Sequence, residues 1–380
     1  MTIRSFARRI RRALARREPL ITVSISKENL LHNLHAYREA YPSMKVAPVL
    51  KSNAYGHGLA VIAEILDKED IAFLMVDSLY EARVLRRSGI RARLCVMGYV
   101  RPEEIAESRL RGVDFAVTDI EQLRTLAQEA HRHVRIHLKL DTGMHRQGIV
   151  PKDLSDAIAL IRSNPHLALV GVTTHLADAD NAESSLTKAQ LELWSEELAR
   201  LEEAFPGIEY RHAAATKGAP WSATEPMNVI RAGMGLYGYD TSPAAKLQLR
   251  PVLEMRSIIA SIRDLVPGDQ VGYNATFTAQ RPSRIATVPA GYYEGIDRGL
   301  SNAGAFLVRG TKAPIAGRVS MNMTSIDVTD VPDVERGDAV TLVSRKPSDP
   351  NSVLSMARLS GTTPYVILAH IPSHLYRVVE

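Results

Sequence analysis

Lys51 follows a short apolar run, Val46–Leu50, and precedes the glycine-containing segment Ser52–Gly58. A lysine at the end of a buried strand is uncommon, because removing an ammonium group from water is costly. Such an amine can act as a nucleophile toward a carbonyl carbon, for example that of an aldehyde cofactor, and the glycines let backbone approach a ligand closely. Considered alone, however, Lys51 is equally compatible with a side chain that covers the strand end and keeps its charge in water.

Other residues that can do chemistry also lie at the ends of apolar runs. They are Lys139 and Asp141 after Val134–Leu138, His175 after Gly171–Thr174, His212 and Thr216 around Glu209–Ala213, and Arg231 before the glycine-rich stretch Ala232–Gly238. A single histidine or arginine in such a place is more often structural or part of an ion pair. Several of them on one rim of a barrel indicate an active site, and the loops after the last barrel strands often bind phosphate.

The elements that must position these residues alternate between strand and helix. Nine apolar runs are predicted as buried strands: Ile21–Ile25, Val46–Leu50, Ile71–Val76, Arg93–Met97, Asp114–Val117, Val134–Leu140, Ala168–Thr174, Glu209–Ala213 and Asn228–Ala232. Helical patterns between them begin at capping residues such as Asp77 or Ser78, the pair Thr118–Asp119, and Ser184. The alternation predicts an α/β class with an N-terminal (β/α)8 TIM-type barrel over residues 19–244, in which Lys51 ends the second strand.

Beyond about residue 245 the pattern changes. Turn signals such as Pro267–Asp269 and Arg336–Asp338 separate short runs rich in Val, Ile and Thr, and a helical pattern returns only near Ser352–Leu359. This texture predicts a mainly β C-terminal domain over residues 245–380.

Charge and composition exclude several classes of protein. The chain has 380 residues, 45% of them hydrophobic, a net charge of +5 and one cysteine, Cys95, which excludes an internal disulfide. Seven arginines fall within residues 1–17; without them, 40 of the 47 basic residues remain against 42 acidic ones. Residues 1–18 are therefore a basic extension, and the body of the chain does not have the charge of a nucleic-acid-binding protein. Because no stretch is long and apolar enough to span a membrane and no internal disulfide is possible, we expect a cytoplasmic location. No metal-binding motif is apparent, and we expect no metal site.

Once these residues are aligned in order, a resemblance to the alanine racemase family is evident. Leu50–Gly58 resembles the family's pyridoxal-phosphate signature, and six further blocks resemble others in the family's order: Leu140–Gly148, Arg231–Gly233, Leu236–Gly238, Val271–Tyr273, Gly291–Tyr292 and Gly317–Met321. The resemblance covers about residues 20–380. It implies a fold-type III, pyridoxal 5'-phosphate-dependent enzyme with the same two domains.

The resemblance also implies roles for individual residues. Lys51 and Tyr273 would be two opposed bases, with Tyr273 and Met321 donated across a homodimer interface, and His175 and Arg231 would form a relay behind the tyrosine. Arg231 would face the pyridine nitrogen and keep it unprotonated, which disfavours transamination. Lys139 would be a carbamylated lysine that holds Arg146.

The remaining family positions fall into three groups. Those implied to bind the cofactor are Lys51, Tyr55, Arg146, His175, Thr216, Arg231, Gly233, Met234 and Tyr365. Those implied to bind substrate are Arg146, Tyr273, Met321 and Asn322, and those lining its access channel are Asp180, Tyr292, Arg298 and Arg318. Departures from the family pattern are Asn322, where aspartate is usual, Ala215 in the phosphate loop, and Val366, where glutamate is common.

The resulting hypothesis is a two-base racemisation of L- and D-alanine that supplies D-alanine for peptidoglycan. Two alternatives stay open: a broad-specificity amino-acid racemase on the same fold, and a non-catalytic pyridoxal-phosphate carrier. Barrel decarboxylases and zinc-dependent D-amino-acid lyases fit less well, because the chain has no late cysteine.

Overall fold

The computed structural model describes residues 19–240 and 247–380, which form two compact units. One unit, the barrel unit, is Lys27–Val252. The other, the β unit, is Leu253–Glu380 together with the described residues up to Ser26. The predicted basic extension, residues 1–18, and the predicted domain boundary at 244/245 lie outside the described residues.

Eight parallel strands form the barrel unit. They are β2 (Lys45–Pro48), β3 (Leu74–Val76), β4 (Leu94–Val96), β5 (Val113–Val117), β6 (Val134–Lys139), β7 (Leu167–Thr173), β8 (Tyr210–His212) and β9 (Val229–Ala232). Strands β3 to β8 make one sheet and β2 pairs with β9. Single bridges, Val49 to Met75 and Ala215 to Arg231, join these two sheets and close the ring. The predicted eight-stranded barrel is therefore confirmed.

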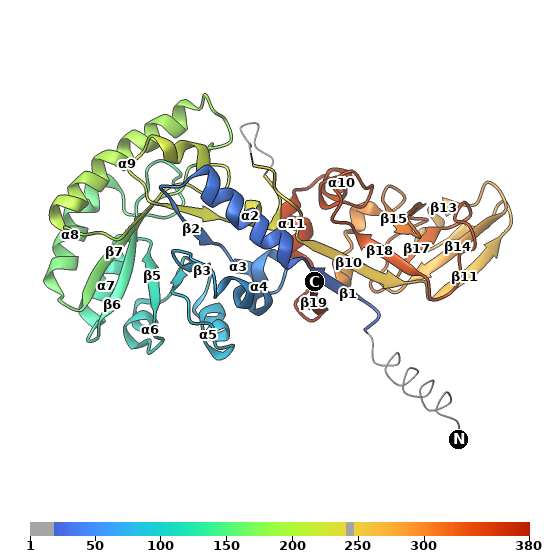
Figure 1. The fold of residues 1–380 in the computed structure, drawn as a ribbon, viewed down its shortest axis with the longest axis horizontal. Coiled ribbons are helices and arrows are strands. Elements are labelled where there is room, and N and C mark those ends of the chain that lie inside the picture. Colours follow the sequence, from blue (N-terminus) through green and yellow to red (C-terminus); the bar gives the residue numbers. More distant parts are fainter. Residues whose placement is uncertain (1–18, 241–246) are drawn as a thin grey trace, which may run out of the picture. The chain divides into compact units, whose positions relative to one another are not determined.

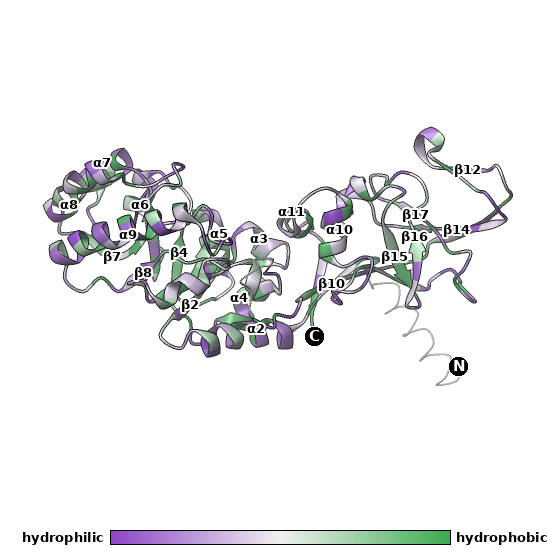
Figure 2. Ribbon diagram, turned by 90° about the horizontal axis from the view of Figure 1, so that it is seen from above, coloured by the Kyte–Doolittle hydropathy of each residue, from purple (hydrophilic) through white to green (hydrophobic). Residues whose placement is uncertain are grey.

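Helices connect the barrel strands and lie outside them (Figure 1). They are α2 (Lys27–Ala40), α3 (Lys51–Tyr55), α4 (Leu59–Leu66), α5 (Leu79–Arg87), α6 (Pro102–Glu107), α7 (Ile120–Glu129), α8 (Leu154–Ser163) and α9 (Ser185–Ala204). The predicted caps Ser78, Asp119 and Ser184 each accept a hydrogen bond from a backbone N–H in the first turn. The buried strands are apolar because helices cover them, as the hydrophobic colouring of β4 illustrates (Figure 2).

The first predicted strand does not belong to the barrel. Strand β1 (Thr22–Ile25) lies in the β unit, between β10 (Leu253–Ile258) and β19 (Tyr376–Val379). The prediction that it opens the barrel was wrong, and Lys51 follows the first barrel strand rather than the second. An apolar run of this length suits either sheet, and only pairing with distant segments decides between them.

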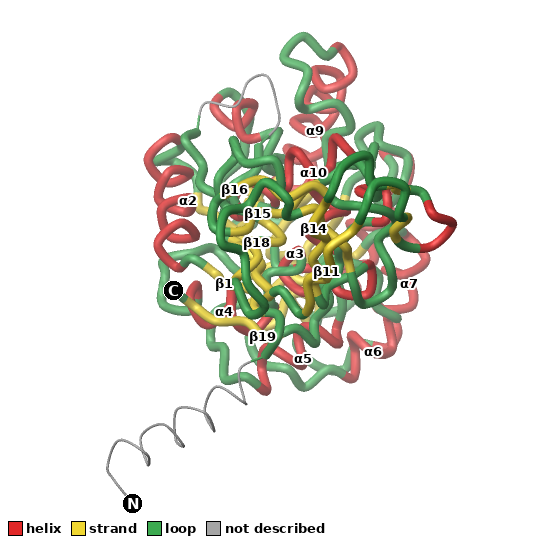
Figure 3. The backbone as a smooth tube through the Cα atoms, turned by 90° about the vertical axis from the view of Figure 1, so that its right-hand side faces the viewer, coloured by secondary structure: helices red, strands yellow, loops and turns green. Residues whose placement is uncertain are grey.

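The β unit contains a six-stranded sheet, a three-stranded sheet and a two-stranded ribbon. The six-stranded sheet has the order β16 (Thr311–Pro314), β15 (Ala305–Val308), β18 (Ala339–Val343), β10, β1, β19. The three-stranded sheet is β11 (Ser261–Leu265), β14 (Ser283–Val288) and β17 (Thr324–Asp327), and the ribbon is β12 (Gln270–Val271) with β13 (Phe277–Thr278). Figure 3 shows β14 beside β11 and β15 beside β18.

Two short helices, α10 (Val353–Leu359) and α11 (Pro364–Ala369), complete the β unit. Its mainly β character agrees with the prediction. Among the residues described in both units, no helix is long and apolar enough to cross a membrane.

A candidate active site in the barrel

A cavity of about 140 Å³ lies at the carboxyl ends of the barrel strands. Its lining residues are Lys51, Met75, Cys95, Met97, Ala116, His137, Lys139, Arg146, Thr173, Thr174, His175, His212 and Arg231. Four of these side chains carry cationic groups, and none of the lining residues is an aspartate or glutamate. The cavity is thus suited to an anionic molecule, and it gathers the lysines, arginines and histidines that the sequence predicted at strand ends.

Lys51 is positioned by a left-handed turn that follows it directly. Ser52, Asn53, Ala54 and Tyr55 all have positive φ, between 50° and 57°. Each such residue is expected to cost about 1 kcal/mol or more, so surrounding contacts must hold the turn. The Asn53 side-chain oxygen accepts a hydrogen bond from the Leu59 N–H at 2.9 Å, which fastens the turn to helix α4. The neighbouring glycines do not explain this turn, because the four residues with positive φ are not glycines.

Arg231 ends strand β9 and is only 3% exposed. Its guanidinium donates to the backbone oxygens of Thr174 and Ala213, both at 2.9 Å, and to that of His212. It also donates to Thr173 Oγ1 at 2.9 Å. Burial lowers the pKa of Arg231 to about 10. The group therefore remains a charged, rigidly held donor near neutral pH.

His175 lies beside Arg231, with its Nδ1 atom 3.2 Å from the guanidinium. Burial lowers the pKa of His175 to about 3, and the charges of Arg231, Arg146, Lys139 and Lys51 act in the same direction. The ring is therefore neutral at physiological pH. Because Nδ1 faces a donor, Nε2 carries the ring proton.

Lys139 and Arg146 occupy the same cavity. Burial lowers the pKa of Lys139 to about 8, helped by the charges of Arg146, Arg231 and Lys51 and opposed by that of Asp141. The ammonium donates to Gln147 Oε1 at 3.3 Å. A lysine with this pKa presents an appreciable fraction of neutral amine near pH 8, and neutral amine is the form that reacts with electrophiles.

Thr216, Gly233 and Tyr55 meet where the chain leaves β9. Thr216 Oγ1 accepts hydrogen bonds from the N–H groups of Gly233 and Gly235, both at 3.2 Å. A Cβ atom at Gly233 would lie 3.0 Å from the Tyr55 hydroxyl. Met234 begins the short 3-10 helix Met234–Tyr237 at this point. Hydroxyl and N–H groups are therefore concentrated in a cradle that only glycine leaves open, a suitable environment for phosphate.

The β unit brings other predicted residues together on neighbouring loops. Tyr273 is 70% exposed, and Met321 is 55% exposed. The loop before Tyr273 lies close to the backbone of Arg318, because a Cβ atom added at Gly272 would be 3.5 Å from the backbone nitrogen of Arg318. Gly291 packs against the backbone of Met321, with an added Cβ meeting the carbonyl oxygen at 2.4 Å. Tyr273 and Met321 are thus large apolar side chains held out in solvent by compact loops.

The other predicted residues of the β unit have local partners or exposed positions. The Asn322 amide donates to Glu294 Oε1 at 2.7 Å, and Tyr292 lies next to this pair in the 3-10 helix Tyr292–Glu294. Arg298 begins the 3-10 helix Arg298–Leu300, and Tyr365 lies in helix α11. Asp180 belongs to the barrel unit, where Lys217 donates to its carboxylate at 2.5 Å.

Two titratable residues of the cavity region, His137 and Asp114, were not predicted from the sequence as site residues. His137, in the middle of β6, lines the cavity, and Asp114, on β5, hydrogen-bonds to His137. Both are fully buried. The available signal was a titratable residue inside an otherwise apolar strand, which needs a partner when it is buried.

The fold and the cavity define a barrel protein whose cation-lined cavity, at the carboxyl ends of its strands, is suited to an anionic small molecule. Residues 25–241 match the alanine racemase N-terminal domain family, and residues 252–379 match the alanine racemase C-terminal domain family. The chain therefore belongs to the alanine racemase family and is an isomerase of that family.

Individual relatives match over nearly the whole chain. An alanine racemase of Sorangium cellulosum is 35% identical over 367 residues, which span 93% of this chain and 97% of the relative. A crystal structure of alanine racemase from Bacillus anthracis with bound L-Ala-P is 30% identical, with a TM-score of 0.88, and covers 96% of this chain and 95% of the other. The biosynthetic alanine racemase of Pseudomonas aeruginosa is 31% identical, with a TM-score of 0.82, and covers 96% and 100%.

Proposed function

We propose that this protein interconverts L- and D-alanine with pyridoxal 5'-phosphate as its cofactor. The observation that carries the proposal is the cavity itself, which combines Lys51, Lys139, Arg146 and Arg231 with no acidic lining residue. Four cationic groups so close together favour a ligand with several negative charges. Pyridoxal phosphate has a phosphate, a phenolic oxygen, an aldehyde that can react with a lysine and a ring nitrogen that can accept a hydrogen bond.

The residues of the barrel fit each part of that cofactor. Lys51 would bind the aldehyde carbon, Arg231 would donate to the ring nitrogen, and Arg146 would contact the phenolic oxygen. The cradle of Thr216, Gly233 and Tyr55, with Met234, would bind the phosphate. For Tyr365, in α11 of the β unit, the proposal of a phosphate contact rests on the family resemblance alone. The bound cofactor makes the α-hydrogen of an amino acid acidic by withdrawing electrons from its Cα atom.

Racemisation then requires one proton-transferring group on each face of Cα. The Lys51 amine would take or return the proton on one face, and the Tyr273 phenol on the other. Because His175 Nδ1 accepts from Arg231, its Nε2–H is available to donate to the tyrosine oxygen and to stabilise a phenolate. Arg231 has no acceptor site, so it would stabilise an unprotonated ring nitrogen and limit electron withdrawal to what racemisation needs.

We propose that Tyr273 and Met321 act in the site of a second subunit of a homodimer. Their exposure, 70% and 55%, supports this assignment, because a subunit interface would cover both side chains. Met321 and Asn322 would contact the substrate carboxylate together with Arg146. Asp180, Tyr292, Arg298 and Arg318 would line the access channel.

Carbamylation of Lys139 belongs to the same proposal. A pKa of about 8 makes neutral amine available for reaction with carbon dioxide, and the product would be an anion beside Arg146. The carbamate would attract Arg146, whereas the protonated Lys139 repels it. An intact-mass measurement with peptide mapping at neutral pH would test it, and unmodified Lys139 in fully active protein would remove it.

The proposal is tested by incubating the cofactor-loaded protein with L-alanine and D-alanine separately and following circular dichroism. Both solutions should lose optical activity, and Lys51→Ala should lose the visible absorbance of bound cofactor. A kcat/KM far higher for serine or a basic amino acid would favour the broad-specificity alternative, which Asn322 keeps open. Cofactor binding without exchange of the α-hydrogen for solvent deuterium would favour the carrier. A racemase would supply D-alanine for peptidoglycan, consistent with a cytoplasmic location.

A further inference from the structure

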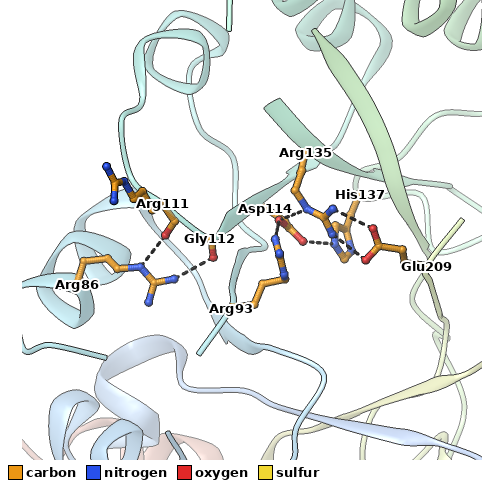
Figure 4. Close-up of polar contacts among 8 residues, drawn as sticks. All are labelled: Arg86, Arg93, Arg111, Gly112, Asp114, Arg135, His137 and Glu209. Carbon is orange, nitrogen blue, oxygen red and sulfur yellow. Dashed lines mark hydrogen bonds and ion pairs between the residues drawn. The ribbon is translucent and has the colours of Figure 1, made fainter. Parts of the chain in front are cut away.

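A chain of hydrogen bonds runs through the buried interior of the barrel from Arg231 to Asp114. The guanidinium lies 3.1 Å from His212 Nδ1, His212 Nε2 lies 2.8 Å from His137 Nδ1, and His137 Nε2 lies 3.3 Å from Asp114 Oδ2. Asp114, His137 and His212 are each 0% exposed. Figure 4 shows the far end of this chain, where His137 and Arg135 both point toward the Asp114 carboxylate.

The direction of every bond in this chain follows from Arg231. The Arg231 Nη1 atom has two hydrogens and also donates to Thr173 Oγ1 and the His212 carbonyl oxygen, so it shares one hydrogen with His212 Nδ1. A guanidinium only donates, so His212 Nδ1 must present a lone pair and, in the neutral ring, His212 Nε2 must carry the proton. His137 Nδ1 therefore accepts from His212, and His137 Nε2 carries a proton that it donates to Asp114. One tautomer of each ring satisfies all three contacts. Burial, the largest cause, lowers the pKa of His212 well below its ordinary value, and the charge of Arg231 acts in the same direction.

The surrounding backbone makes room for the contact between the two histidines. The pairing of β6 and β7 shifts register after Ile136, which places Gly171 opposite His137. A Cβ atom at Gly171 would lie 2.4 Å from His137 Nδ1, the atom that faces His212. Only glycine therefore lets the ring occupy this position.

The carboxylate of Asp114 is itself held in one orientation. Its Oδ1 atom accepts from Arg93 at 2.8 Å and from Arg135 at 2.9 Å, so Oδ2 is the oxygen that faces His137. Burial alone would raise the pKa of Asp114, but the hydrogen bonds from His137 and Arg135 and the charge of Arg135 bring it below its ordinary value. The group is thus ionised and can act only as an acceptor.

We propose that Asp114, His137 and His212 are positioning residues that fix the orientation of Arg231 by setting the tautomers of the two histidines. Asp114 accepts from His137, His137 accepts from His212, and His212 accepts from the guanidinium. None of the three needs to touch the substrate. The hydrogen-bond relay is a property of the barrel alone, whereas its effect on racemisation rests on the function proposed above.

Asp114→Asn should invert the relay without changing the volume of the side chain. Arg93 and Arg135 donate to Oδ1, so the amide oxygen should stay on that side and the amide NH2 should replace Oδ2. His137 Nε2 would then have to accept, which moves its proton to Nδ1. His212 Nε2 would accept in turn, and its Nδ1–H would oppose the Arg231 donor.

Glu209→Gln is the matched control. Glu209 forms the bidentate pair with Arg135, at 2.9 Å for each bond (Figure 4). This substitution removes the same charge from the same group of ion pairs, but it leaves the bond between Asp114 and His137 in place. It should therefore leave both tautomers unchanged.

The experiment combines a measurement of tautomers with one of kinetics on the full-length, cofactor-loaded protein. Two-bond ¹H–¹⁵N spectra of protein with ¹⁵N-labelled histidine rings report which nitrogen carries the proton, with His137→Asn and His212→Asn used for assignment. In the wild type, both rings should carry the proton on Nε2, and in Asp114→Asn both should carry it on Nδ1. The kcat for L-alanine should fall about 10- to 100-fold in Asp114→Asn, with KM little changed, as when an outer partner of a site residue is lost. Glu209→Gln should match the wild type in both measurements.

The results separate the relay from the proposed function. A wild-type ring protonated on Nδ1, or an Asp114→Asn protein with unchanged tautomers, would overturn the relay. Inverted tautomers with kcat within two-fold of wild type, or an equal loss of kcat in Glu209→Gln, would overturn the positioning role. If Asp114→Asn does not fold, the tautomers of the two rings in the wild type still test the relay. If the wild type does not racemise alanine, the proposed function fails while the spectra still test the relay.

Discussion

Replacing Lys139 by glutamine should stabilise the cofactor-free protein. Burial and the charges of Arg146, Arg231 and Lys51 lower the pKa of Lys139 from 10.5 to about 8. At pH 7 the amine is protonated in both the folded and the unfolded states, so the charged form carries the full penalty of its surroundings. Lys139→Gln removes this penalty and retains a polar group that can bond to Gln147.

The size of the effect follows from the pKa. One pKa unit corresponds to about 1.4 kcal/mol, so a lowering from 10.5 to about 8 would correspond to about 3.4 kcal/mol for a fully buried group. Lys139 is only partly buried, and solvent screening reduces the figure to about 1–2 kcal/mol. For a unit of this size we expect an increase in Tm of about 2–8 °C at pH 7.

The pH dependence has a defined sign. Between pH 8 and 10.5 the unfolded chain binds a proton at Lys139 that the folded protein has released, so wild-type stability should rise with pH over this interval. Lys139→Gln should lack that rise, and its advantage over the wild type should disappear by about pH 10.5. Lys152→Gln, at an exposed lysine of the same unit, is the matched control.

Thermal unfolding in buffer free of carbon dioxide measures these differences, and a repeat with bicarbonate adds a test of the proposed carbamate. Bicarbonate should raise the Tm of the wild type alone, because only Lys139 can become the anion that binds Arg146. A Lys139→Gln protein no more stable than Lys152→Gln at pH 7 would refute the assigned repulsion among the four cations of the cavity.

Three further substitutions test other parts of the site. Tyr273→Phe should keep the absorbance of bound cofactor and lose about 100-fold or more of racemase activity, as expected for removal of a general base, and retained activity would exclude the tyrosine from catalysis. Gly233→Ala should weaken cofactor binding by about 10-fold or more, measured by titration with pyridoxal phosphate, because its Cβ would lie 3.0 Å from the Tyr55 hydroxyl. Asn322→Asp should lower Tm by a few degrees at pH 7, because a carboxylate would replace the amide that donates to Glu294, and an unchanged Tm would contradict a stabilising role for this bond.

The fold was largely predictable from periodicity. Strand β1 is the exception, because periodicity does not determine which sheet a strand joins. Eight of the nine predicted strands form the barrel, because buried parallel strands have continuous apolar runs. Strand β1 has such a run too, with Val23 and Ile25 fully buried, yet it pairs with β10 and β19. Its partners are more than 200 residues away in the chain, and nothing local distinguishes it from a barrel strand.

The site was predictable only in part, for two physical reasons. Strand-end residues such as Lys51, Lys139, His175 and Arg231 were found because parallel strands bring their carboxyl ends to one rim. The left-handed turn Ser52–Tyr55 was not, because Ser52, Ala54 and Tyr55 do not individually favour positive φ and the conformation depends on contacts made elsewhere. Positions in the β unit such as Tyr273 and Tyr365 were predicted from family resemblance alone, and their roles stay predictions.

The polar residues inside the barrel link its stability to its chemistry. Asp114 on β5 and Arg231 on β9 are opposite charges buried at the two ends of the relay, and His137 and His212 connect them with oriented hydrogen bonds. Removing the Asp114 carboxylate leaves Arg93 and Arg135 without the anion they share, and removing the Arg231 guanidinium leaves the buried oxygens of Thr174 and Ala213 without this donor, so both losses are destabilising. Replacing either histidine keeps both charges but breaks the chain of hydrogen bonds between Asp114 and Arg231. The two kinds of variant should therefore differ: loss of a charge should lower stability and activity together, whereas loss of a ring should affect mainly the orientation of Arg231.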